Sequence, residues 1–124
     1  MSVKAFAAKV FAQKIERKVQ KWAQKPLETQ EKTFKFLLKT AQDTDFGKDH
    51  NFAQIKSHED FIANVPVRDY EALRPYVDKM VEGKTNVLWP EKPLYFAKTS
   101  GTTSGSKYIP ITKESMPTHT TAAR

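Results

Sequence analysis

Eight consecutive residues in the last quarter of this chain have the composition of an anion-binding loop. From Thr99 to Ser106, six side chains carry hydroxyl groups and the other two residues are glycines. Glycine permits positive φ and lets the backbone come close to a ligand, and successive N–H groups in such a turn form a concave anion site. Hydroxyl groups add rotatable donors, and Lys98 and Lys107 place positive charge at the two ends. The chemistry predicted for this stretch is phosphate binding.

The spacing separates this stretch from the best-known phosphate loop. A Walker A loop needs four residues between its glycines and a lysine directly after the second. Here three residues separate Gly101 from Gly105, and Ser106 comes before Lys107. Clusters of Gly, Ser and Thr also occur as plain flexible connections. From composition alone, a phosphate loop of another kind and a flexible connection both stay open.

The order of the residues from Thr99 to Lys107 is more particular than their composition. It resembles the nucleotide-phosphate loop of the adenylate-forming superfamily, and within it that of the auxin-responsive acyl-acid amido synthetases, in a bacterial-type form. The resemblance covers about residues 46 to 115. The segments before the loop that follow the order of this family are Phe46–His50, Ile55, Glu59–Phe61, Val65–Tyr70 and Val87–Pro90.

The resemblance implies both a fold and an activity. The fold is α+β: N-terminal helices precede a strand–loop–strand, together an incomplete piece of the large N-terminal domain of an adenylate-forming enzyme. The activity is that of an ATP-dependent ligase, which forms an acyl-adenylate from a carboxylic acid and transfers the acyl group to the amine of an amino acid. The expected ligands are therefore ATP with Mg²⁺, a carboxylic acid and an amino acid. No residue is assigned as a metal ligand or a catalytic group.

Matching the family's loop residue by residue assigns the nucleotide-binding positions. They are Thr99, Ser100, Gly101, Thr102, Thr103, Gly105 and Lys107. The hydroxyl groups are expected to contact the β- and γ-phosphates, and the glycines to let the backbone approach. Two positions depart from the family's pattern: Thr99 stands where the family often has serine, and Lys107 lies one residue closer to the second glycine, which leaves its contact with phosphate open.

In this family the loop lies early in a much longer protein. The chain is therefore expected to be an N-terminal fragment, with the motifs for adenine, ribose and the acyl group beyond Arg124. By itself the fragment is predicted to be inactive. Because small chains bury little surface, its helical part is also expected to be only marginally stable alone.

Length and composition exclude several classes of protein. A length of 124 residues allows at most one domain, and the absence of cysteine excludes disulfide scaffolds and thiolate metal sites. The sequence contains no run of 18 or more apolar residues, so no transmembrane helix is expected. The expected location is the cytoplasm.

The net charge of +7 is concentrated at one end of the chain. Residues 1–25 hold seven basic and one acidic side chain, a net of +6, and the other 99 residues hold 14 basic and 13 acidic ones, a net of +1. The nearly neutral remainder argues against nucleic-acid binding. An amphipathic helix is predicted at 3–22; it either packs on a core or, in the alternative function, binds an anionic membrane or nucleic acid. A small helical interaction protein with an incidental loop is a third hypothesis.

The predicted elements follow the periodicity and the capping residues. Residues 1–45 are expected to form a helical hairpin. Pro26 marks the break between its helices and can lie in the first turn of the second, which is predicted at 27–43 and ended near Gly47. Short helices and loops are expected over 46–93, with an irregular stretch at 48–56. Residues 94–112 are the predicted strand–phosphate loop–strand, and 113–124 the start of a helix.

Within 46–93 the caps locate two helices. Ser57 and Asp60 have the spacing of a capping box, and Asp69 is a good N-cap. Pro75 predicts either a kink or two short helices, at 70–74 and 75–82. Gly83 is expected to end this segment.

Overall fold

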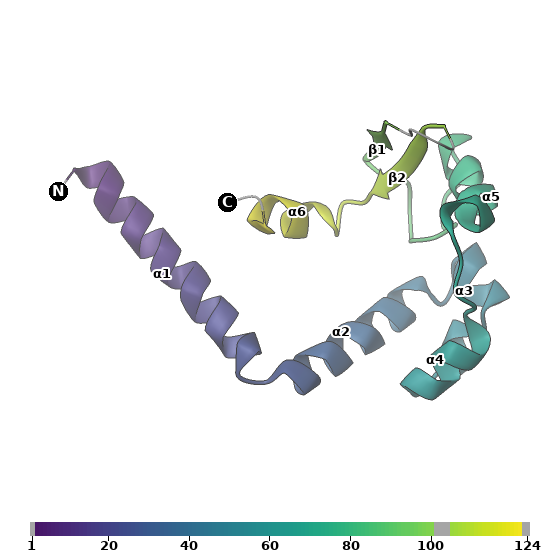
Figure 1. Ribbon diagram of the computed structural model, residues 1–124, viewed down its shortest axis with the longest axis horizontal. Coiled ribbons are helices and arrows are strands. Elements are labelled where there is room, and N and C mark those ends of the chain that lie inside the picture. The colour runs from purple at the N-terminus through teal and green to yellow at the C-terminus, as the bar shows by residue number, and fades with distance from the viewer. Residues whose placement is uncertain (1, 101–104, 123–124) are drawn as a thin grey trace. The chain divides into compact units, whose positions relative to one another are not determined.

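The computed structural model describes residues 2–100 and 105–122 (Figure 1). The chain divides into two compact units, Met1–Phe36 and Leu37–Arg124. The first unit contains α1 (Val3–Ala23) and the beginning of α2 (Pro26–Ala41). The second contains the rest of α2, then α3 (Asp45–Asp49), the 3-10 helix η1 (Phe52–Gln54), α4 (His58–Asn64), α5 (Tyr70–Val81), β1 (Tyr95–Thr99), β2 (Lys107–Ile111) and α6 (Met116–Ala122). Helices followed by a strand–loop–strand confirm the predicted α+β class.

Helix α1 forms where the apolar periodicity predicts it. Its N-cap is Ser2, whose hydroxyl accepts a hydrogen bond from the N–H of Ala5 at 3.3 Å. None of the residues in α1 is buried, and Phe6, Phe11 and Trp22 are each about half exposed. Whether this face packs on a core or binds an anionic surface stays a prediction, as does the hairpin over residues 1–45.

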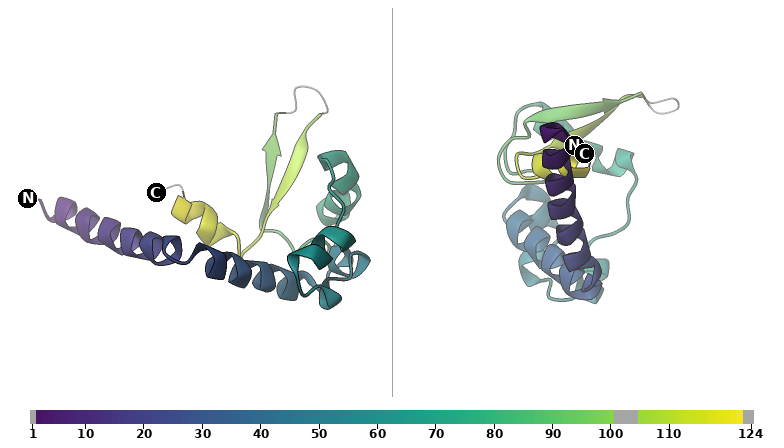
Figure 2. Two further views of the ribbon diagram at one scale, coloured as in Figure 1. Left: turned by 60° about the horizontal axis from the view of Figure 1, so that its bottom comes forward. Right: turned by 90° about the vertical axis from the view of Figure 1, so that its left-hand side faces the viewer.

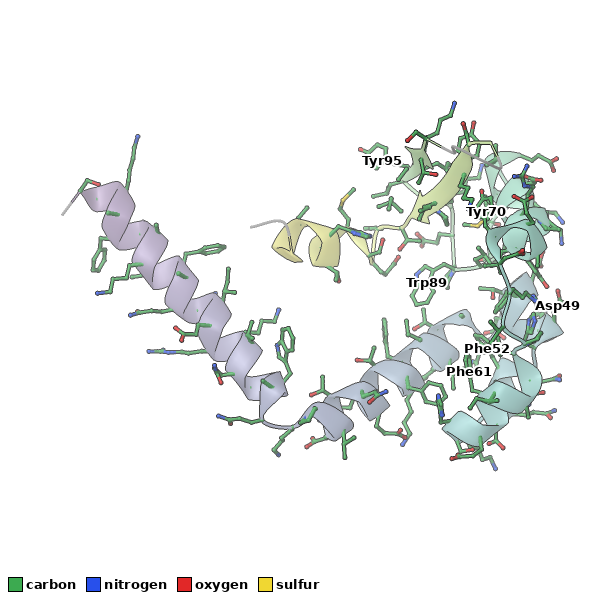
Figure 3. The ribbon with its side chains drawn as sticks, in the orientation of Figure 1. Asp49, Phe52, Phe61, Tyr70, Trp89 and Tyr95 are labelled. Atoms are coloured by element: carbon green, nitrogen blue, oxygen red, sulfur yellow. The ribbon has the colours of Figure 1, made fainter. Side chains whose placement is uncertain are left out.

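The core of the second unit gathers around the end of α2. Its buried apolar side chains are Leu38, Ala41, Phe52, Ile55, Val77, Met80 and Val87. Aromatic rings extend it toward α4, where the centroids of Phe52 and Phe61 lie 6.2 Å apart (Figure 3). In the part of the chain that the structure describes, no helix has the length and apolar character needed to cross a membrane.

A buried hydroxyl group makes the corner between α2 and α3. Thr44 is 1% exposed; its hydroxyl donates to the carbonyl of Ala41 at 2.6 Å and accepts from the N–H of Gly47 at 3.0 Å. Two further N–H groups at the start of α3 donate to the connection before the hairpin: that of Asp45 to the Asn86 carbonyl, at 2.9 Å, and that of Phe46 to the Val87 carbonyl, at 3.0 Å. These bonds attach the connection to the helical core.

The role predicted for Gly47 is wrong. Helix α2 ends at Ala41, and Gly47 lies inside α3 rather than terminating the helix before it. A Cβ at Gly47 would lie 2.0 Å from the Ala41 carbonyl oxygen, so glycine is required there by the close approach of two backbones. The stretch 48–56 is likewise more regular than predicted, because α3 and η1 occupy most of it.

The capping predictions for α4 and α5 are confirmed. Ser57 and Asp60 make both bonds of a capping box, and Asp69 accepts from the N–H of Ala72 at 2.9 Å. Residues 70–81 form a single helix with Pro75 inside it, so the two-helix alternative is wrong. Because Pro75 lacks an N–H, one backbone hydrogen bond is absent from the second turn of α5. Gly83 follows this helix with a φ of +94°, which favours glycine.

The two strands form an antiparallel ribbon (Figure 2). Their register pairs Tyr95 with Ile111 at one end and Thr99 with Lys107 at the other. After β2, Thr112 and Ser115 exchange hydrogen bonds between hydroxyl and N–H groups at 3.0 and 3.1 Å. Helix α6 begins at Met116, so the predicted helical start at Lys113 is a turn instead.

We expect Gly47→Ala to lower the free energy of unfolding of the intact protein by about 2 kcal/mol or more, because the added methyl meets a backbone atom that side-chain rotation cannot move. Urea denaturation measures the loss. Gly105→Ala is the matched control: a Cβ there meets nothing within 4 Å among residues 2–100 and 105–122, and its positive φ is what disfavours alanine. The control should lose about 1 kcal/mol. Equal losses in the two variants would contradict the steric explanation.

The capping box also predicts a pH dependence. The N–H of Lys56, the hydroxyl of Ser57 and the N–H of Ser57 lower the pKa of Asp60 below its ordinary value. Since the folded pKa is the lower one, this stabilisation is present above the unfolded pKa of about 4 and is lost as the pH falls through the folded pKa. We expect Asp60→Asn to lower the urea midpoint more at pH 6 than at pH 3.

The control for this measurement is Glu59→Gln, which removes a charge from the same helical turn and leaves both capping bonds in place. Its effect on the midpoint should change less between the two pH values. An effect of Asp60→Asn that does not depend on pH would show that the ionised carboxylate is not what stabilises the cap.

Candidate functional site

The antiparallel ribbon brings the two ends of the predicted loop together. Thr99 is the last residue of β1 and Lys107 the first of β2, and the two are direct cross-strand partners. Ser100 and Gly105 continue from these ends, and both are exposed. Gly101, Thr102 and Thr103 lie outside the described residues. Of the seven predicted nucleotide-binding residues, the structure therefore describes the four at the base of the loop.

Gly105 has the backbone conformation expected for a glycine in an anion-binding loop. Its φ is +79°, in the left-handed region where L side chains are disfavoured. A Cβ built on it would meet no atom of the described residues within 4 Å. The glycine is therefore favoured by the backbone conformation and not by a close contact with another described residue.

The ribbon carries a lysine on each of its faces. Directly opposed residues in an antiparallel pair share a face, and successive residues alternate between faces. Lys98, paired with Tyr108, thus lies on one face, and Lys107, paired with Thr99, on the other. Both ammonium groups lie near tyrosine rings: Lys98 Nζ is 6.0 Å from the centroid of Tyr108, and Lys107 Nζ is 5.6 Å from that of Tyr70.

These features fit a phosphate group. Exposed backbone at a positive-φ glycine and a hydroxyl at Ser100 supply hydrogen-bond donors, and Lys107 adds positive charge at the base of the loop. A cation within about 6 Å of a ring face is also restrained by attraction to the ring. Among the described residues, no three Asp, Glu or His side chains come together as a metal site, and Mg²⁺ stays a prediction from the resemblance.

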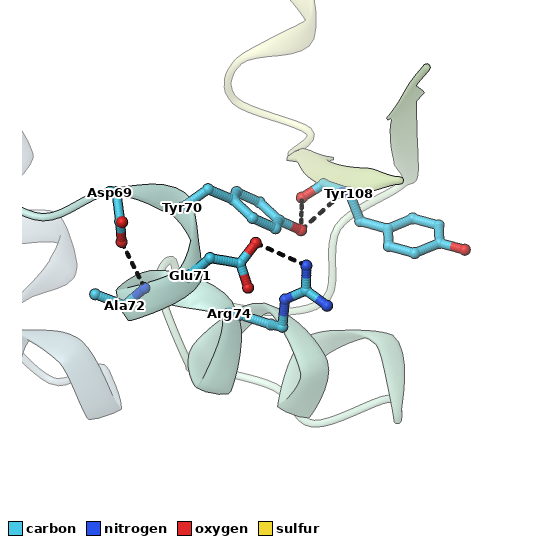
Figure 4. Close-up of polar contacts among 6 residues, drawn as sticks. All are labelled: Asp69, Tyr70, Glu71, Ala72, Arg74 and Tyr108. Carbon is cyan, nitrogen blue, oxygen red and sulfur yellow. Dashed lines mark hydrogen bonds and ion pairs between the residues drawn. The ribbon is translucent and has the colours of Figure 1, made fainter. Parts of the chain in front are cut away.

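The sequence analysis missed the residues of α5 that hold the ribbon. The hydroxyl of Tyr70 accepts from the N–H of Tyr108 at 2.7 Å and donates to the carbonyl of the same residue at 3.2 Å (Figure 4). The guanidinium carbon of Arg74 lies 5.6 Å from the centroid of the Tyr70 ring, and Arg74 pairs with Glu71 at 2.9 Å. Tyr70 and Tyr108 are 38 residues apart, so no local spacing could have indicated this contact.

A second tyrosine on α5 has a different role. The hydroxyl of Tyr76 donates to the carboxylate of Asp49 at 2.7 Å. Burial, and next the hydrogen bond to this carboxylate, raise the pKa of Tyr76 above its ordinary value. The ring also packs edge-on against Phe46, with centroids 5.2 Å apart. Tyr76 therefore stabilises the packing of α5 on α3 rather than contributing to the hairpin.

His50 is also structural. It is 3% exposed and stacks on Phe46 with ring centroids 4.1 Å apart. Its Nδ1 lies 2.7 Å from the carbonyl oxygen of Phe46. The imidazole is thus held against Phe46 at the end of α3.

Comparison with known proteins gives one family. The family model described as the GH3 family N-terminal domain matches residues 15–124. Two relatives from Arabidopsis thaliana match over 60 residues, which is 47% of this chain: indole-3-acetic acid-amido synthetase GH3.15 at 38% identity and indole-3-acetic acid-amido synthetase GH3.10 at 35%. The match covers 10% of the length of each relative. No solved structure matches the chain.

Proposed function

The chain belongs to the GH3 family, and on that premise we propose that it is the N-terminal part of an ATP-dependent acyl-acid amido ligase whose phosphate-binding loop is the β1–β2 hairpin. The observation that carries the proposal is the hairpin itself. Its register places Thr99 and Lys107 opposite each other, next to Ser100 and to Gly105 at positive φ. The two relatives, both named as amido synthetases of indole-3-acetic acid, support the reaction class.

The proposed reaction has two steps. A carboxylate oxygen of the acid attacks the α-phosphorus of ATP, the bond to the β-phosphate oxygen breaks, and pyrophosphate leaves with its electron pair. The amine of an amino acid then attacks the acyl carbon, losing a proton, and AMP leaves. Adenylation is needed because a carboxylate is a poor electrophile until a good leaving group is attached to it.

The hairpin would contribute to the first step by binding the phosphates. Three linked phosphates and a carboxylate repel one another, and preorganised N–H and hydroxyl donors offset that charge as pyrophosphate leaves. Ser100 and Thr99 would donate from hydroxyl groups, Gly105 would allow backbone approach, and Lys107 would add a cation at the base of the loop. Gly101, Thr102 and Thr103 complete the proposed set. Mg²⁺ bound with ATP would neutralise further charge on the phosphates.

The organisation of the chain is part of the proposal. Residues 94–112 supply the phosphate-binding hairpin, and the helices before it supply the base to which the hairpin is attached. The pockets for the acid, the amino acid, adenine and ribose would lie in sequence that follows residue 124. Residues 1–124 alone would therefore bind part of the nucleotide and would catalyse neither step.

The proposal predicts that Ser100→Ala in the intact protein lowers acid-dependent ATP–pyrophosphate exchange at least about tenfold, because a hydrogen bond to a charged phosphate is lost. Gly105→Val should abolish exchange, since a β-branched residue is strongly disfavoured at positive φ. Circular dichroism should show both variants folded. Thr85→Ala, which removes an exposed hydroxyl from the connection before the hairpin, should leave exchange unchanged. Full exchange in Ser100→Ala and Gly105→Val would refute the site.

The intact mass of the native polypeptide is a separate check. An antibody raised against residues 1–25 should detect, in the source cell, a product several times heavier than the 14.2 kDa of residues 1–124. A product of 14.2 kDa would contradict the ligase proposal. The binding module and the helical interaction protein would then become the leading hypotheses.

A further inference from the structure

We propose that Tyr70 is a positioning residue for Lys107: its hydroxyl fixes β2 against α5 and thereby holds the Lys107 ammonium group at the phosphate-binding end of the hairpin. This inference rests on the proposed function, in which that end binds the phosphates of a nucleotide. Tyr70 itself would not contact the phosphates.

The hydroxyl of Tyr70 occupies the place of a third strand. Within a β-strand, the N–H and C=O of one residue point to the same side of the ribbon. Both of these groups in Tyr108 bond the Tyr70 hydroxyl, so they point away from β1 and toward α5. One side chain thereby satisfies a donor and an acceptor that would otherwise be unpaired on a strand edge.

The bonded residue is next to Lys107 in the sequence. Tyr108 follows Lys107 directly in β2, so a shift of the Tyr108 backbone moves the Cα of Lys107 with it. The Tyr70 ring provides a second restraint, because Lys107 Nζ lies 5.6 Å from its centroid. Lysine has a flexible four-carbon stem and is poorly positioned without such contacts. The hydroxyl and the ring of Tyr70 thus act on the backbone and the side chain of the same segment.

Tyr70 is itself rigidly placed. It is the first residue of α5, directly after the N-cap Asp69, whose carboxylate accepts from the N–H of Ala72 at 2.9 Å. The Arg74 guanidinium, one turn along the helix, lies 5.6 Å from the ring centroid, and its ion pair with Glu71 orients it (Figure 4). The position of Lys107 therefore depends on the capped N-terminus of α5.

The test is Tyr70→Phe in the intact protein, which removes the hydroxyl and keeps the ring. Hydrogen–deuterium exchange of the peptide that contains β2 should become about three- to tenfold faster at the Tyr108 amide, the range expected for losing one hydrogen bond. Reductive methylation of Lys107, measured on the same peptide, should also become faster. The KM for ATP in the exchange assay should rise about three- to tenfold, with a smaller change in kcat.

Tyr76→Phe is the matched control, because it removes a hydroxyl from the same helix that bonds Asp49 instead of β2. It should leave β2 exchange, Lys107 methylation and the KM for ATP unchanged. A double-mutant cycle tests whether Tyr70 acts through Lys107. In a Lys107→Met background, Tyr70→Phe should no longer raise the KM for ATP, since coupled residues give non-additive effects.

The outcomes separate the inference from the function on which it rests. Three results for Tyr70→Phe would each overturn the positioning role. They are an unchanged hydrogen–deuterium exchange rate at the Tyr108 amide, a faster rate there with an unchanged KM for ATP, or effects on the KM that are additive with those of Lys107→Met. Absence of acid-dependent ATP–pyrophosphate exchange in the unmutated protein would refute the proposed function instead. In that case the β2 exchange and the Lys107 methylation rate still decide whether Tyr70 positions Lys107.

Discussion

The hydrogen-bonding edge of β2 is the constraint on which the candidate site depends. A ribbon of two strands is only marginally stable in water, because half of its backbone groups have no strand to pair with. Here the outward N–H and C=O of Tyr108 both bond the hydroxyl of Tyr70, at 2.7 and 3.2 Å. A helix thereby stabilises the ribbon through a single polar atom.

The corner around Thr44 has the matching role for the other end of the ribbon. The N–H groups of Asp45 and Phe46 would be unpaired at the start of α3, and the carbonyls of Asn86 and Val87 accept from them instead. Val87 is 0% exposed, so the connection is anchored by burial as well. The chain enters β1 from this anchored connection, and β2 is bonded to α5 at Tyr108, just after the strand begins. The hairpin is thus tied to the same helical core before and after the loop.

The charge distribution separates the candidate site from the most basic part of the chain. Residues 1–25 have a net charge of +6 and belong to the first unit, whereas the hairpin belongs to the second. Anion binding at the hairpin therefore does not follow from the overall charge of +7. It would depend on Lys107, placed by its cross-strand pairing with Thr99, and on backbone donors near Gly105. The proposal of phosphate binding therefore rests on local geometry and not on net charge.

The sequence by itself determined the features that depend on neighbours three or four residues away. The cap at Ser57 with Asp60, the cap at Asp69 and the strands on either side of the Gly/Ser/Thr stretch form as predicted, because the capping bonds and the dihedral preferences of the strand residues are local. Tertiary structure alone decided the roles of Gly47 and Tyr70. Gly47 is required by the Ala41 carbonyl oxygen, to which a Cβ would approach within 2.0 Å, and Tyr70 acts on a strand 38 residues away. The first contact depends on how the chain turns between two helices and the second on how a helix meets a strand, and neither follows from the type and spacing of the residues alone.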